Sequence, residues 1–175
     1  MPCQVDVIVP WRAGCSYRSR AWSWVQDQYR SAHPGWRIVE TVAPVGPWCK
    51  AAAINAAASV STADIVVVAD ADVWATNLQA AVDAAQAGGW VIPHRRVHRL
   101  TEQATAQLIA GGIATETCEP PYVGIEGGGI VVLPRRTLLE VPMDERFLGW
   151  GQEDQAWGIA LHFMVAPSTR LDGDL

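Results

Sequence analysis

The sequence predicts a single α/β domain built on a central, mostly parallel sheet with helices on both faces. Two observations lead to this prediction. Short runs rich in valine and isoleucine alternate with segments of helical periodicity, and 175 residues suit one domain with a sizeable core. No internal repeat or linker divides the chain. The strands are therefore expected to share one sheet.

Apolar, mostly β-branched runs predict the strands. They lie at residues 5–9, 38–42, 65–69, 90–92 and 130–133. Helical propensity or an i, i+3, i+4 apolar pattern predicts the helices between them. These span residues 19–30, 50–59, from 78 to the glycine pair at 88–89, 101–110, and 152–163. Residues 111–129 are predicted to be a long loop, and the residues after 167 show no pattern.

The composition excludes several classes of protein. A net charge of −5, with 18% charged residues, does not favour a nucleic-acid-binding surface. The N-terminal residues have no signal-peptide pattern, and no apolar stretch approaches the ~20 residues of a membrane span. The four cysteines form no C-x-x-C pair and suit a reducing compartment. We therefore expect a cytoplasmic protein without a membrane span.

Asp70-Ala71-Asp72 is the most informative motif, because it directly follows the predicted buried strand at 65–69. Two carboxylates separated by one residue project to the same side of an extended segment. At the carboxyl end of such a strand they face the crevice where open α/β sheets bind ligands. Together they suit a hard divalent cation that also contacts phosphate oxygens. The alternative is an ordinary turn that caps the next helix.

Two other α/β functions compete for this motif. A nicotinamide-binding Rossmann domain requires G-x-G-x-x-G after the first strand, whereas residues 10–14 read Pro-Trp-Arg-Ala-Gly, so we set it aside. An Asp-x-Asp phosphatase or phosphotransferase would use Asp70 as nucleophile and Asp72 as acid. In that family the pair follows the first strand, whereas here it follows the third. This possibility stays open as the less favoured enzyme.

Four segments, in the right order, resemble nucleotide-sugar glycosyltransferases of the GT-A fold. Residues 7–10 resemble the opening strand, residues 50–55 the K-x-x-A-x-N helix, and residues 70–72 the DxD motif. Residues 127–130 followed by Gly149-Trp150-Gly151-Gln152-Glu153-Asp154 look like the G-G…G-W-G-x-E-D signature of the β-1,4-galactosyltransferase-like group. The set covers roughly residues 5 to 162, and compact bacterial or phage-type members are the most similar.

The resemblance implies a metal-dependent hexosyltransferase that moves a sugar from a nucleoside diphosphate sugar, UDP-sugar being favoured, to a hydroxyl of a glycan or another acceptor. Residues 1–93 would form the nucleotide-sugar-binding half and residues 94–175 the acceptor-side half of one domain. Asp70 and Asp72 would hold Mn²⁺ or Mg²⁺, which stabilises the leaving diphosphate. The second aspartate would bind the metal directly, and the first would contact the ribose or reach the metal through water.

The donor is expected to be held by residues from several segments. They are Pro10, Arg12, Glu40, Lys50, Asn55, Asp70, Gly128 and Gly129. Arg12 can reach the diphosphate and Glu40 can accept from the ribose or base. The family's nucleoside-side positions match Lys50 and Asn55. Lys50 as an ordinary solvated lysine, or Asn55 as a partner of the Asp70 turn, remain alternatives.

The acceptor side is predicted from the residues before and within the last helix. Trp150 offers a flat face for sugar stacking, Glu153 would bind an acceptor hydroxyl, and Asp154 would be the general base. A base opposite the leaving group gives inversion at the anomeric carbon. The alternative is that both acids only complement the helix dipole. His94, Arg95, Arg96 and His98 form a basic cluster that suits a diphosphate or a solvated turn.

One departure from the family pattern concerns the metal. Many members have a third ligand, a histidine after the last motif helix, and no residue of this sequence matches it; His162 lies inside the predicted helix. This leaves a second function open, a nucleotide-sugar-binding protein without turnover.

Overall fold

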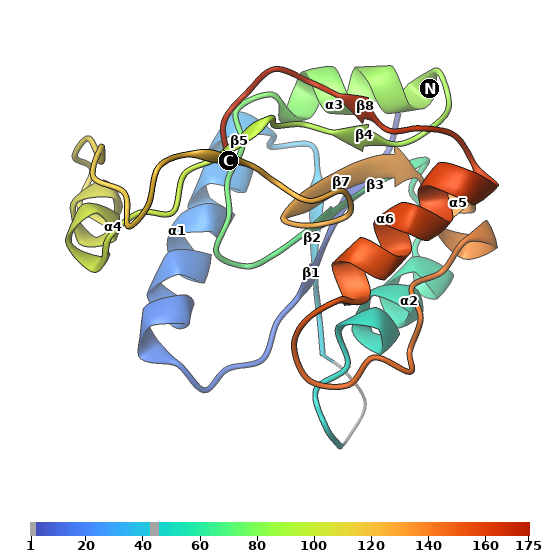
Figure 1. Ribbon diagram of the computed structural model, residues 1–175, viewed down its shortest axis with the longest axis horizontal. Coiled ribbons are helices and arrows are strands. Elements are labelled where there is room, and N and C mark those ends of the chain that lie inside the picture. Colours follow the sequence, from blue (N-terminus) through green and yellow to red (C-terminus); the bar gives the residue numbers. More distant parts are fainter. Residues whose placement is uncertain (1–2, 43–45) are drawn as a thin grey trace.

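A computed structural model describes residues 3–42 and 46–175, and its centre is one six-stranded sheet (Figure 1). The strand order is β2-β1-β3-β7-β4-β8. The strands are β1 (Val5–Pro10), β2 (Arg37–Thr41), β3 (Ile65–Ala69), β4 (Val91–Ile92), β7 (Ile130–Pro134) and β8 (Thr169–Arg170). β7 is antiparallel to β3 and β4, and the other pairs are parallel. The predicted α/β class with a mostly parallel sheet is confirmed.

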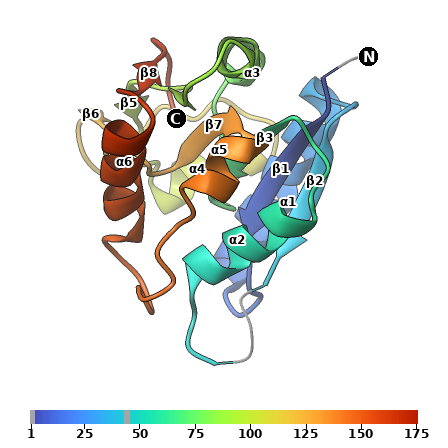
Figure 2. The same ribbon diagram turned by 90° about the vertical axis from the view of Figure 1, so that its right-hand side faces the viewer.

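Helices cover both faces of this sheet, because its central strands are apolar on both sides. On β3, Val66 and Val68 face one core, and Ile65 and Val67 face the other. The first core is closed by α2 (Lys50–Val60), α5 (Arg135–Glu140) and α6 (Glu153–Met164), which lie in front in Figure 2. The second is closed by α1 (Ser16–Ala32) and α3 (Leu78–Gln86).

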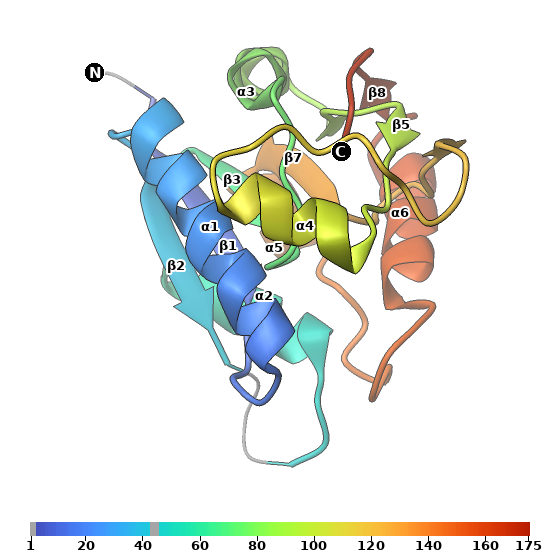
Figure 3. The same ribbon diagram turned by 90° about the vertical axis from the view of Figure 1, so that its left-hand side faces the viewer.

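A smaller layer lies beside α1, where Figure 3 shows α4 (Glu102–Ile109) next to that helix. The strands β5 (Arg96–Val97) and β6 (Tyr122–Val123) form a separate antiparallel pair. β6 lies inside the segment that was predicted to be a long loop. None of the helices in the described part of the chain is long and apolar enough to cross a bilayer.

The predicted strands and helices are all present, with ends that agree or differ by at most three residues. The first strand extends one residue beyond the predicted range 5–9, to Pro10, which is paired with Thr41 of β2 and not with β3. The missing N–H of Pro10 therefore costs no hydrogen bond to the central strand β3. The elements α5, β5, β6 and β8, which are all short, were not predicted.

Candidate active site

The starts of α2 and α6 lie side by side at the edge of the sheet where β3 ends (Figure 1). Lys50 is the first residue of α2, and Asp70 directly follows β3. The ammonium Nζ of Lys50 lies 2.6 Å from Asp70 Oδ1 and 2.8 Å from Asp154 Oδ1 on α6. The Lys50 side chain is only 10% exposed. Three segments that are distant in sequence thus converge on one buried ammonium group.

Burial and charge shift the pKa values of this cluster. Burial raises the pKa of the Asp154 carboxyl; Lys50 opposes this, but Asp70 and Glu153 add to it, and the pKa rises to about 6. Burial alone would lower the pKa of the Lys50 ammonium, but Asp70 and Asp154 outweigh it and the pKa rises above its usual value. Two carboxylates share one cation, so Asp154 binds a proton more readily than an isolated aspartate does.

Asp72, the second residue of the Asp-x-Asp pair, points away from Lys50 toward α1. Its Oδ2 lies 3.4 Å from Nε of Arg18, and its side chain is 41% exposed. Arg18 also lies over the ring of Trp11. Each of the two aspartates therefore faces a different protein cation.

The first turn of α6 is positioned by an unusual backbone. Gln152, just before the helix, has a left-handed φ of 69°, and Gly149 and Gly151 also have positive φ values. Such conformations cost energy for a residue with a side chain and commonly occur near functional sites. The turn directs Glu153 into the interior, where it is buried, and Asp154 toward Lys50.

The glycines before β7 contact protein atoms. A Cβ atom on Gly127 would overlap the backbone carbonyl oxygen of Asp154, so this glycine allows close packing on α6. The carbonyl oxygen of Gly129 accepts a hydrogen bond from the Asp70 N–H at 3.0 Å, and this glycine lies against Leu175 and His94. Gly128 lies against Ile125. The donor-binding role of Gly128 and Gly129 stays a prediction, and their neighbours indicate a packing role as well.

Asn55, on α2, has both ends of its amide bound to the segment before α6. Its Nδ2 donates to the Met143 carbonyl oxygen and to Glu145 Oε1, both at 2.9 Å, and its Oδ1 accepts from the Met143 N–H at 3.1 Å. Among the described residues it makes no hydrogen bond to the Asp70 turn. Asn55 thus ties α2 to residues 143–145, and its predicted contact with a nucleoside would add to this role.

The remaining predicted donor residues lie at the carboxyl ends of β1 and β2. Pro10 is buried as the last residue of β1. Arg12 is exposed and lies over the ring of Trp48, 5.2 Å from its centre. Glu40 is exposed and accepts a hydrogen bond from Gln26. Their donor roles stay predictions.

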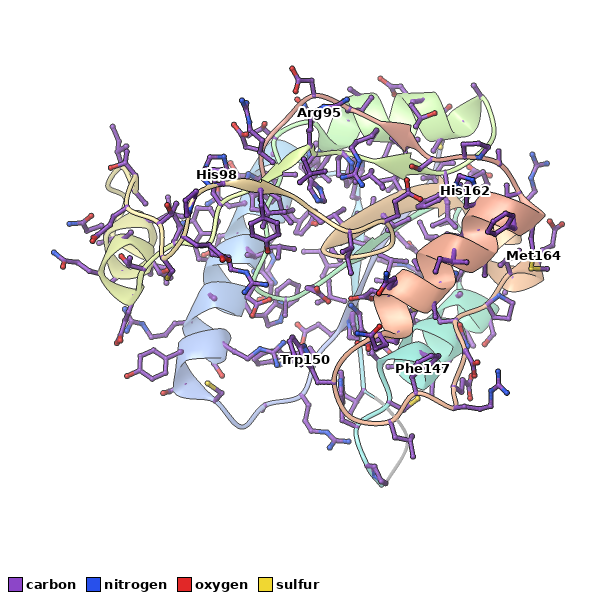
Figure 4. All side chains as sticks on the ribbon, in the orientation of Figure 1. Arg95, His98, Phe147, Trp150, His162 and Met164 are labelled. Carbon is purple, nitrogen blue, oxygen red and sulfur yellow. The ribbon has the colours of Figure 1, made fainter. Side chains whose placement is uncertain are left out.

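Trp150 is the most exposed large hydrophobic side chain of the described residues, at 94%. It belongs to the loop before α6, and its side chain is labelled in Figure 4. An indole ring that is left in water offers both faces to a ligand. This placement suits the predicted acceptor contact.

In the basic cluster of residues 94–98, three of the four side chains are at least partly exposed and contact acids near the C-terminus. Arg96 and His98 contact Asp174 at 2.8 and 3.1 Å, and Arg95 lies 3.8 Å from Asp172 (Figure 4 labels Arg95 and His98). His94 is fully buried, and burial together with Arg170 lowers its pKa to about 4. The C-terminal acids thus neutralise a cluster that the sequence alone offered to a diphosphate.

Asp70 and Asp72 fit a divalent cation by the chemistry of their carboxylate oxygens, which hard cations prefer. Within residues 3–42 and 46–175, no three His, Cys, Asp or Glu side chains converge closely enough to hold an ion by themselves. The other ligands would have to be water and oxygens of a bound diphosphate, as is common for Mg²⁺ sites. To bind such an ion, Asp70 would have to separate from Lys50 and Asp72 from Arg18.

The fold is shared with several solved structures. The chain aligns with Drosophila β-1,4-galactosyltransferase 7, solved with manganese, UDP-Gal and xylobiose, at a TM-score of 0.65 and 15% identity, over 96% of this chain and 64% of that one. This is a GT-A-like fold. Staphylococcus aureus TarS aligns at a TM-score of 0.55 and 11% identity, over 96% of this chain and 58% of the TarS chain.

A third similar structure is the Mycobacterium tuberculosis glucosyl-3-phosphoglycerate synthase with Mn²⁺, UDP and glucosyl-3-phosphoglycerate. It aligns at a TM-score of 0.54 and 13% identity, over 99% of this chain and 71% of that one. The chain also aligns with the bifunctional IspDF of Campylobacter jejuni, at a TM-score of 0.54 and 9% identity. The chain spans between half and two thirds of the galactosyltransferase, TarS and IspDF structures. No family model and no curated sequence matches it.

Three contacts of the site were not predicted from the sequence: those of Lys50 with Asp70 and with Asp154, and that of Arg18 with Asp72. One feature of the sequence distinguishes Lys50, although it does not indicate its partners. Lys50 is the only lysine of the chain, whereas the other twelve side chains of the Lys and Arg class are arginines. The sequence holds no comparable signal for Arg18, which is one of several arginines on or near α1.

Proposed function

We propose that this protein is a metal-dependent, inverting glycosyltransferase that moves a sugar from a nucleoside diphosphate sugar, a UDP-sugar being favoured, to a hydroxyl acceptor. The single observation that carries the proposal is the convergence of Asp70 and Asp154 on Lys50. It brings the DxD motif, the lysine of the K-x-x-A-x-N helix and the acidic pair of the last motif to one place. The resemblance of these motifs and the GT-A-like fold support it.

The residues divide into a donor side and an acceptor side. Asp70 and Asp72 would hold Mn²⁺ or Mg²⁺, and the ion would stabilise negative charge on the leaving diphosphate. Residues 1–93 supply most of this donor side. Residues 94–175 supply the glycine segment and α6. We further propose that the protein is cytoplasmic and that its acceptor is not a nucleic acid.

On the acceptor side, Asp154 accepts the proton of the attacking hydroxyl group. Its raised pKa makes it a stronger base than a free aspartate, while Lys50 limits the rise, so that most of the carboxyl groups are still ionised at neutral pH. Glu153, buried in the same turn, and Trp150, exposed before it, position the acceptor. Attack from this side expels the diphosphate directly and inverts the anomeric carbon.

A ligand panel tests this proposal. Thermal unfolding is measured with UDP, GDP, ADP and their sugars, each with and without Mn²⁺, because a ligand of the native state raises the melting temperature. We expect a rise with UDP or a UDP-sugar that requires Mn²⁺. Release of UDP is then followed with water and simple glycosides as acceptors. Binding without any release indicates the donor-binding alternative, and no binding by any nucleotide contradicts the proposal.

A further inference from the structure

Lys50 lies where a helix disfavours a cation. It is the first residue of α2, directly after the N-cap Cys49, and the helix dipole places partial positive charge there. Its side chain is also buried, which is unusual for lysine. Neither the helix nor solvent explains this placement. The two carboxylates do, since they lie within 2.8 Å of the ammonium group.

The two partners of Lys50 belong to opposite sides of the proposed reaction. Asp70 belongs to the donor side and Asp154 to the acceptor side. In the part of the chain that the structure describes, no other cation forms an ion pair with either of them. The other nearby cation, Arg18, pairs with Asp72. One ammonium group therefore pairs with two carboxylates, and a change in its contact with one of them must alter its contact with the other.

We propose that Lys50 is a positioning residue that exchanges partners when the donor binds. As a nucleoside diphosphate and its divalent cation engage Asp70, the ammonium leaves this residue and pairs with Asp154 alone. A divalent cation repels the ammonium and competes for the same oxygen. This inference rests on the proposed function and deepens it, because donor binding would then set the orientation of the acceptor-side base.

The chemistry of lysine suits this role. Its ammonium is a compact charge with three donors on a flexible stem, so a small rotation can change its partner. The planar fork of arginine would instead favour a bidentate pair with one carboxylate. Coupling between two sites is reciprocal, so a change at Asp154 should also alter donor affinity. The expected order of binding is donor first and acceptor second.

The single lysine makes a direct test possible. In protein grown with ¹³C-labelled lysine, Lys50 gives the only ε-CH₂ signal, and it is followed by NMR during titration with UDP and Mg²⁺. We expect a shift that saturates together with binding measured by calorimetry. In Asp70→Asn the signal without nucleotide should already lie near the bound position, since Asp154 is then the only carboxylate partner. Saturated binding without a shift in the unmutated protein overturns the inference.

A second measurement uses affinity. With Asp154→Asn, Lys50 keeps Asp70 as its only charged partner, so UDP with Mg²⁺ should bind about fivefold more weakly or worse, within the usual range of coupling between sites. Asp83→Asn is the control: it removes one exposed negative charge on α3 and does not touch Lys50. Equal affinity of both variants and the unmutated protein overturns the inference. If the unmutated protein binds no nucleotide with either metal, the proposed function fails, and the inference fails with it.

Discussion

Gly127 lies so close to the first turn of α6 that a Cβ atom would overlap the backbone carbonyl oxygen of Asp154. Its φ of +87° is also a conformation that residues with side chains rarely adopt. The segment before β7 and the proposed base are therefore fixed to each other through their backbones. The position of Asp154 depends on the absence of a side chain 27 residues earlier in the chain.

Gly127→Ala should lower the free energy of unfolding by about 1–3 kcal/mol, the usual cost of such backbone strain, with added cost from the overlap. Chemical denaturation measures this change. Gly35→Ala is the matched control, because a Cβ atom on Gly35 would meet no neighbour within 4 Å and its φ is not positive. Equal stability of the two variants would show that the contact between Gly127 and α6 is looser than described.

Asp154→Asn should reduce the rate of sugar transfer, or of donor hydrolysis, by about 10²–10⁴-fold, the usual contribution of a general base. The amide cannot accept the proton of the acceptor hydroxyl. The loss of turnover should far exceed the loss of donor affinity. Rates are measured at saturating donor. A variant that folds and retains most of its turnover would place the base elsewhere.

The raised pKa of Asp154 predicts two opposite pH effects. The base must be ionised, so turnover should rise with pH through about 6 and level off above it. The folded protein holds this proton more tightly than the unfolded chain, whose aspartate has a pKa near 3.8. The stability that Asp154 contributes is therefore complete below pH 3.8 and is lost as pH rises through about 6.

Denaturation curves at several pH values check the stability effect. Other groups also titrate in this range, so the measurement is the difference between the unmutated protein and Asp154→Asn. The asparagine variant should lack the component that falls between pH 3.8 and about 6. Parallel stability curves for the two proteins would contradict the raised pKa.

Asn55→Ala should lower the free energy of unfolding by about 1–3 kcal/mol, because it leaves the Met143 N–H and carbonyl groups without their partner. Ser59→Ala is a control on the same helix, where the hydroxyl donates only to the Ala56 carbonyl oxygen among the described residues. Calorimetry with UDP separates the two roles of Asn55. Lower stability with unchanged UDP affinity would limit Asn55 to joining α2 and residues 143–145.

Asp72→Asn should remove most of the effect of Mn²⁺ on UDP binding, since the exposed carboxylate is the more accessible candidate ligand. Binding isotherms for UDP are measured with and without Mn²⁺, and Asp83→Asn serves as the charge-matched control. An unchanged dependence on Mn²⁺ in Asp72→Asn would remove Asp72 from the metal site.

Most of the fold could be predicted because long apolar runs and helical patterns are local signals. β3 and β7 are continuous buried strands, and α3 shows its apolar face at regular spacing. β8 has only two residues, and its polar sequence gains order from pairing with β4. The antiparallel direction of β7 also has no local signature, because a run buried on both faces reads the same in either direction.

The sequence predicts candidate residues for the site but not the contacts between them. Asp70 and Asp154 were recognised from motifs, yet their common partner Lys50 is 104 residues from Asp154 in sequence. The ion pairs of the basic cluster were not predictable for the same reason. Arg96 pairs with Asp174, which is 78 residues away, and no local pattern indicates that pair. Charge pairing of this kind is set by the tertiary structure.

The position of β7 in the sheet determines whether the chain can be cut into two fragments that fold separately. β7 belongs to the second half of the sequence, yet it lies between β3 and β4 of the first half. A fragment ending at residue 93 would leave the side of β3 with open backbone groups and an apolar surface, which invites aggregation. The two halves of the sequence are therefore interleaved in one sheet. A split version of this protein should fold only when both fragments are present together.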